Sequence, residues 1–160
     1  EYLAINPMGK IPTLRYGDTV ITEAAAIILF LADLFPEKQL APAVGTAERG
    51  EYYRWFCFMV GPMEAAMMEK FWKLSPPPEA SKSLGYGDFE RVVHTIEQAL
   101  TGKSYLVGAQ FTAADLYLCA FLQFSYRMQV WPESSVCRNY IQRIEQREAY
   151  IRAMRSMETA

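Results

Sequence analysis

Histidine is the scarcest chemically versatile residue in this sequence. The chain has one histidine, His94, among 160 residues. A zinc site built from several histidines is therefore excluded, and we expect no metal site. A nucleophile–histidine–acid triad would have to use His94, which falls within an amphipathic helical pattern. We therefore interpret His94 as a helix residue at or near the surface rather than a catalytic base.

Cysteine is also sparse. The three cysteines, Cys57, Cys119 and Cys137, are widely spaced and form no Cys-x-x-Cys pair. Their odd number and spacing argue against a disulfide framework. Because all three lie in apolar, helical-looking stretches, we expect buried free thiols, which fit a reducing, cytoplasmic setting.

The sequence has neither a long apolar run nor a large excess of charge. Its longest unbroken apolar run, Ala24 to Ala32, is too short to cross a bilayer, so no membrane span is expected. The 16 basic and 18 acidic residues leave a formal net charge of −2, which disfavours a nucleic-acid partner bound through phosphates. With 51% hydrophobic residues, the chain can bury a globular core and is not intrinsically disordered.

The first part of the chain has the pattern of a hairpin followed by a helix. Residues 11–16 and 19–21 have the composition of strands, and Gly17-Asp18 between them is a turn signal. Together they predict a β-hairpin. We expect Thr22 to cap the following helix, with Glu23 in its first turn.

That first helix is apolar almost all round, so we expect it to be buried on more than one face. It should end at Pro36. A linker-like stretch covers 39–46. The pattern over 47–160 is helical, apart from Gly61-Pro62, where a kink or split is expected, and a loop at 75–87 that contains three consecutive prolines. Later helices are predicted near 89–100, 116–128, 134–146 and 148–157.

Thr112 and Asp115 mark the start of the most apolar of these helices. A hydroxyl residue followed three positions later by an acid resembles a capping box, with Asp115 in the place of the usual glutamate. We therefore assign both residues a structural role rather than a catalytic one.

Three motifs in order resemble one known family. The first is Asn6-Pro7-Met8-Gly9-Lys10-Ile11-Pro12-Thr13-Leu14 followed by Ile21-Thr22-Glu23-Ala24, the second is the capped segment 111–115, and the third is the tail 140–150. Each is weak alone, but together they resemble the cytosolic glutathione transferases, in the form seen in bacterial members. The resemblance covers essentially the whole chain.

The resemblance implies a fold of two unequal parts. Residues 1–38 would be a partial, α/β, thioredoxin-like domain that consists of a β-hairpin and a helix. Residues 39–46 would be a linker, and 47–160 the all-α C-terminal domain of the family. The family's first strand, first helix and second strand would precede Glu1, so we expect roughly 40–60 further residues in the natural polypeptide.

The resemblance also assigns glutathione-binding residues. Pro12 matches the family's cis-proline, which exposes the backbone of Ile11 for pairing with the cysteinyl part of glutathione. Lys10 is placed toward the glycine carboxylate. Glu23 would hold the γ-glutamyl ammonium, and Ala24 stands where the family usually has Ser or Thr. Each assignment has a structural alternative: a trans proline, a solvated lysine or a plain helix-start acid.

A second-substrate pocket is implied along the helix that follows the linker. The resemblance and the apolar stripe suggest Phe58, Met59, Glu64 and Met67 as its lining. Core packing is the alternative for the apolar side chains. A solvated position is the alternative for Glu64. The family's catalytic residue, a Tyr, Ser or Cys at the glutathione sulfur, is expected upstream of Glu1, so it is not assigned here.

The function implied is conjugation of glutathione to a hydrophobic electrophilic small molecule, or a related glutathione-dependent reaction. Glutathione would be a co-substrate, and no permanently bound cofactor is expected. A homodimer is the family's usual state. The alternative is a binding or regulatory module with the same fold and no transferase activity. Ala24 favours this alternative slightly, because it lacks the hydroxyl of the usual Ser or Thr.

Overall fold

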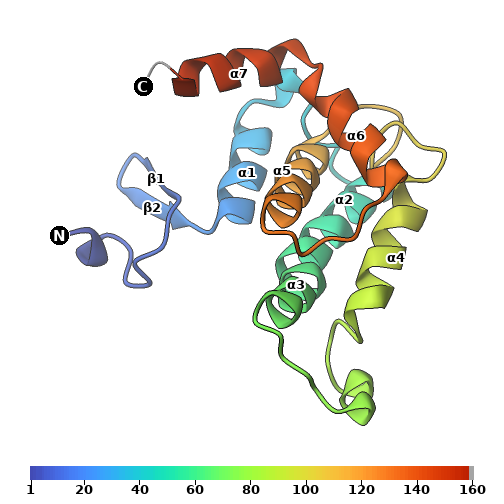
Figure 1. Cartoon of the computed structure of the whole chain (residues 1–160). Coiled ribbons are helices and arrows are strands. Elements are labelled where there is room, and N and C mark those ends of the chain that lie inside the picture. The colour runs from blue at the N-terminus through green and yellow to red at the C-terminus, as the bar shows by residue number, and fades with distance from the viewer. Residues whose placement is uncertain (159–160) are drawn as a thin grey trace.

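The computed structural model describes residues 1–158 (Figure 1). Strands β1 (Thr13–Tyr16) and β2 (Thr19–Thr22) form an antiparallel hairpin whose outermost pair joins Thr13 to Thr22. Gly17 occupies the turn with a φ of 59°, a conformation that glycine adopts without a steric penalty. The predicted hairpin is therefore confirmed, although its first strand begins at Thr13 rather than at residue 11.

Helix α1 (Ala24–Leu34) follows the hairpin directly. Two expectations about it are wrong. The N-cap is Glu23 rather than Thr22, because β2 continues through Thr22 and the chain turns only after it. The helix is also less buried than its composition suggested, since only Ile27 and Ala32 are buried and most other side chains are half-buried.

The rest of the described chain is helical. The helices are α2 (Ala47–Phe58), α3 (Glu64–Phe71), α4 (Phe89–Leu100), α5 (Ala113–Arg127), α6 (Ser135–Glu145) and α7 (Glu148–Glu158). Short 3-10 turns cover Tyr2–Ala4, Pro36–Lys38 and Pro78–Lys82. As expected, Pro62 interrupts the first long helix, here through a π-helical turn at Met59–Met63. This order confirms a partial thioredoxin-like unit followed by an all-helical domain.

The core gathers around α5. Leu118, Cys119 and Leu122 on this helix are at most 1% exposed. The predicted apolar face of α4 is buried as well, at Phe89, Val92, Val93, Ile96 and Leu100. In Figure 1 the hairpin stands at the left of the helical body, and α1 lies between the hairpin and α5. The edge-on contact between the rings of Tyr16 and Phe30, 5.2 Å between centroids, joins the hairpin to α1.

The carboxylate of Asp115 lies at the centre of this core and is 0% exposed. Its two oxygens accept hydrogen bonds from the N–H groups of Leu106 and Thr112, the Thr112 hydroxyl and the Tyr140 hydroxyl, at 2.7, 2.7, 3.0 and 2.7 Å. The capping box predicted at Thr112 and Asp115 is thus present. It also ties the loop before α5 to α6.

The cysteine prediction is partly wrong. Cys119 and Cys137 are buried free thiols, as expected, but Cys57 is exposed. All three remain unpaired. Trp55 and Phe56, immediately before Cys57, take the buried positions of α2, so the cysteine is turned outward. An apolar stretch does not by itself reveal which residue of the helix faces solvent.

We predict that the protein loses stability in alkali. Burial raises the pKa of the Cys119 thiol from 9.0 to about 12, and burial also raises the pKa of the Tyr126 hydroxyl from 10.0 to about 12. In the unfolded chain both groups lose their protons earlier, so the unfolded state binds fewer protons in this range. The stabilisation is fully present below pH 9 for Cys119 and below pH 10 for Tyr126, and both contributions are lost as the pH rises to 12.

Urea unfolding across this pH range measures the effect. The midpoint should fall steadily above pH 9, and the Cys119→Ala variant should show a shallower fall. A urea midpoint that stays level between pH 9 and 12 would contradict the raised pKa values of Cys119 and Tyr126.

Candidate functional site

The open end of the hairpin brings together two predicted parts of the site. The peptide bond between Ile11 and Pro12 is cis, and Pro12 directly precedes Thr13. Because Thr13 pairs with Thr22, the chain continues from this same pair into Pro12 on one strand and Glu23 on the other. The register therefore places the cis bond beside the start of α1.

Two residues that the sequence analysis did not single out hold the loop before the cis bond. The buried side chain of Asn6 donates to the Lys10 carbonyl at 2.7 Å and accepts from the Met8 N–H at 3.1 Å. The Tyr2 hydroxyl donates to the same carbonyl at 2.6 Å. An asparagine that bonds the N–H two residues on is a known turn signal, and Asn6-Pro7 could have revealed it.

The backbone at Ile11 is open. The side chain of Ile11 is 85% exposed, and Lys10 and Pro12 are exposed as well. Within residues 1–158, the N–H and C=O of Ile11 have no hydrogen-bond partner. Both groups can therefore pair with an extended peptide, as the edge of a short strand does.

The first turn of α1 presents free donors next to an acid. Glu23 is exposed and has a φ of 69°, a region that non-glycine residues rarely occupy. Within the described chain, no side chain caps this end of α1. The N–H groups of Ala24 and its two successors therefore lack intrahelical partners, as at any helix start. Such an end favours a carboxylate, and Glu23 can accept from an ammonium group.

Tyr117 on α5 was not predicted as part of the site. Its ring is half-buried and stacks on Phe56, with 5.5 Å between centroids. Burial raises the pKa of its hydroxyl, and the negative charges of Glu64 and Glu23 raise this pKa further. The two carboxylates come from different parts of the fold, and both act electrostatically on the same hydroxyl.

The residues predicted for a second-substrate pocket divide into two groups. Phe58 is half-buried and Glu64 is exposed, so both are accessible. Met59 is 0% exposed and Met67 is 3% exposed. The Met67 sulfur also accepts from the Ser125 hydroxyl at 2.7 Å. These two methionines are buried in the core and do not line an open pocket, because Met67 meets Ser125 of α5 and Met59 lies within the main apolar cluster.

Neither a metal site nor a triad is found among the described residues. No three His, Cys, Asp or Glu side chains within 1–158 converge as metal ligands. His94 is exposed on α4, which agrees with a surface helix residue. Of the helices described, none is long and apolar enough to cross a membrane.

Comparison with protein families gives two matches in the expected order. Residues 1–34 match the family model "Glutathione S-transferase, N-terminal domain", and residues 63–148 match "Glutathione S-transferase, C-terminal domain". The curated relatives include glutathione S-transferase GstA of Escherichia coli O157:H7, which is 29% identical over 81% of this chain and 64% of its own length. They also include glutathione S-transferase Z2 of Arabidopsis thaliana, which is 30% identical over 82% and 63%.

Solved structures agree. A glutathione transferase from Methylococcus capsulatus is 32% identical, with a TM-score of 0.78, over 99% of this chain and 79% of that one. A sphingomonad glutathione S-transferase complexed with glutathione is 26% identical, with a TM-score of 0.76 and the same coverage. The chain spans somewhat under two thirds of the length of the curated relatives above. Since both family models match, in order, on a fold shared with these enzymes, the chain belongs to the glutathione S-transferase family.

Proposed function

We propose that the protein transfers glutathione to a hydrophobic electrophilic small molecule, or runs a related glutathione-dependent reaction. The observation that carries this proposal is the hairpin register, which sets the cis bond at Pro12 beside the uncapped start of α1. Membership of the family supports it. The solved sphingomonad relative was complexed with glutathione.

Each part of glutathione has a partner in this proposal. The N–H and C=O of Ile11, which precedes the cis bond to Pro12, pair with the cysteinyl backbone. Lys10 meets the glycine carboxylate. Glu23 accepts from the γ-glutamyl ammonium, and the first N–H groups of α1 donate to the γ-glutamyl carboxylate. Ala24 supplies only its N–H, so one hydroxyl donor is missing, worth about 0.5–1.5 kcal/mol.

We place the electrophile next to the glutathione site, on its helical side. Phe58 offers apolar surface, while Glu64 and the Tyr117 hydroxyl supply polar groups. None of these residues is assigned the activation of the glutathione thiol. That role requires a donor that lowers the pKa of a thiol from near 8.5, so that more thiolate is present at neutral pH.

A homodimer in the cytoplasm completes the proposal. Three unpaired cysteines fit a reducing compartment. The outer side of α2 carries exposed apolar surface, with Tyr53 45% exposed, and this early part of the first long helix is the proposed dimer contact.

A second candidate is a binding or regulatory module with the same fold. One observation favours it, namely Ala24 at the first position of α1, which removes a hydroxyl donor from the γ-glutamyl end. Lys10, Glu23 and the cis bond at Pro12 favour a functional glutathione site instead.

Retention on immobilised glutathione, followed by turnover with a generic aryl electrophile, separates the two. We expect the full natural polypeptide to be retained, to elute with free glutathione and to form the conjugate. Retention without turnover would favour the binding module. Neither retention nor turnover would contradict the proposed function.

A further inference from the structure

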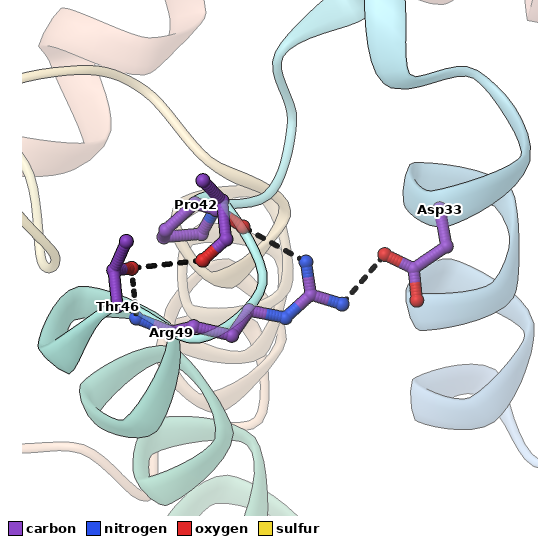
Figure 2. Close-up of polar contacts among 5 residues, drawn as sticks. Asp33, Pro42, Thr46 and Arg49 are labelled. Carbon is purple, nitrogen blue, oxygen red and sulfur yellow. Dashed lines mark hydrogen bonds and ion pairs between the residues drawn. The ribbon is translucent and has the colours of Figure 1, made fainter.

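The far end of α1 is held by one buried arginine of the helical domain. Arg49, in the first turn of α2, is 5% exposed. Its Nη2 meets the Asp33 carboxylate of α1 at 2.6 Å, and its Nη1 donates to the Pro42 carbonyl in the linker at 2.9 Å. Figure 2 shows the guanidinium reaching from α2 to both partners. One side chain thus joins α1, the linker and α2.

The guanidinium itself has little freedom. It lies over the rings of Tyr52 and Tyr53, with 5.4 and 4.9 Å to the ring centroids. The first turn of α2 is fixed by Thr46, which accepts from the Arg49 N–H at 3.3 Å and donates to the Ala43 carbonyl at 2.8 Å (Figure 2). The Arg49 side chain is therefore held in one position and is not a mobile surface group.

Apolar packing at this junction joins α1 and the linker to the helical core, through Ala32, Leu40 and Ala41. The end of α1, the linker, the start of α2 and the loop 107–112 line an open pocket of about 760 Å³, whose lining includes Asp33 and Arg49. Across this pocket, α1 and α2 make few of the close contacts that fix one helix against another. The ion pair beside it links the end of α1 directly to α2.

Helix α1 connects this junction to the glutathione end. Its eleven residues rise about 1.5 Å each, so Asp33 and Glu23 are about 15 Å apart along the axis. A tilt of about 4° at one end of such a rod moves the other end by about 1 Å, which is enough to impair a positioned site. The charge of Asp33 acts weakly over that distance, because salt screens beyond about 8–10 Å.

We propose that Arg49 is a positioning residue for the glutathione site: through Asp33 and the Pro42 carbonyl it fixes the direction of α1 and, with it, the location of Glu23. This inference rests on the proposed function, since it concerns affinity for glutathione. It adds a residue that touches neither substrate and lies in the other part of the fold.

The proposal is tested by calorimetric titration of glutathione into the full natural polypeptide, at a temperature well below its unfolding midpoint. We expect Arg49→Met to raise the Kd by about tenfold and Asp33→Asn by about threefold or more. Arg49→Lys keeps the charge but cannot span both partners, so it should fall between Arg49→Met and the parent. The double variant Asp33→Asn/Arg49→Met should bind no more weakly than Arg49→Met alone, because both changes break one link.

A matched control separates position from stability. Glu133→Gln breaks another arginine–carboxylate pair, between Arg138 and Glu133, on the exposed surface, and should leave the Kd unchanged. If Arg49→Met does not fold, the half-exposed Asp33→Asn variant decides the question. Variants with lowered unfolding midpoints and the parent's Kd would overturn the positioning role. A parent protein that does not bind glutathione would instead refute the proposed function, and this inference with it.

Discussion

Replacing Asp115 with asparagine will lower the free energy of unfolding by about 3 kcal/mol or more. The carboxylate is fully buried and accepts from four donors, two of them backbone N–H groups. Asparagine offers one acceptor oxygen and turns an NH₂ group toward donors, so at least one buried donor loses its partner. Such a loss costs about 1–3 kcal/mol for each group, and bonds to a charged acceptor are the stronger kind.

Chemical unfolding followed by circular dichroism measures the change. Asp88→Asn is the control: Asp88 is another acid at the start of a helix, where it is the N-cap and accepts from the Arg91 N–H on the surface, and asparagine caps helices well. Its effect should stay within about 0.5 kcal/mol. Burial raises the pKa of Asp115, and its hydrogen bonds oppose that rise. An Asp115→Asn protein as stable as the parent would show that these four bonds do not hold α5 in place.

Replacing Glu23 with alanine will weaken glutathione binding by about 10- to 100-fold. In the proposed complex the carboxylate meets the γ-glutamyl ammonium, and a hydrogen bond to a charged group contributes about 1.5–3 kcal/mol. The exposed Glu23 side chain makes no ion pair among the residues described. Its loss should therefore change affinity far more than stability.

Titration of glutathione into the parent and three variants makes this test specific. Glu23→Gln keeps the shape and one acceptor oxygen, so its affinity should fall between those of the parent and Glu23→Ala. Glu37→Ala removes another exposed acid, one that follows α1, and should leave affinity unchanged. Equal affinity of Glu23→Ala and the parent would show that the γ-glutamyl end is bound elsewhere.

Local chemistry made the hairpin, the helix order and the buried role of Asp115 predictable. Gly17-Asp18 between apolar strands, Pro62 within a helical pattern and the Thr112–Asp115 spacing are signals that act within a few residues. The family resemblance added the cis bond at Pro12, which no local rule requires. In each case the information lies close together in the chain.

The start of α1 was misplaced because two local preferences compete there. Threonine is a better N-cap than glutamate, yet Thr22 is needed to pair with Thr13 in the hairpin. The cap therefore moves to Glu23, which adopts a positive φ. A backbone conformation of this kind costs about 1–3 kcal/mol and is kept where the surroundings impose it. Nothing in the sequence indicates that Glu23 is held in this conformation.

Residues that act between distant segments could not be found in the sequence. Arg49 reaches Asp33 across the linker, and two carboxylates from different parts of the fold act electrostatically on the Tyr117 hydroxyl. The assignment of Met59 and Met67 to an open pocket failed for the same reason. A helical stripe shows that side chains share a face, but only the packing of the folded helices shows that this face is closed.

The structure of the full natural polypeptide with glutathione bound tests the central claim most directly. The account predicts the cysteinyl backbone paired with the N–H and C=O of Ile11, the γ-glutamyl ammonium at Glu23 and the γ-glutamyl carboxylate at the first N–H groups of α1. Glutathione bound away from the cis bond at Pro12, or with its γ-glutamyl end remote from Glu23, would contradict it.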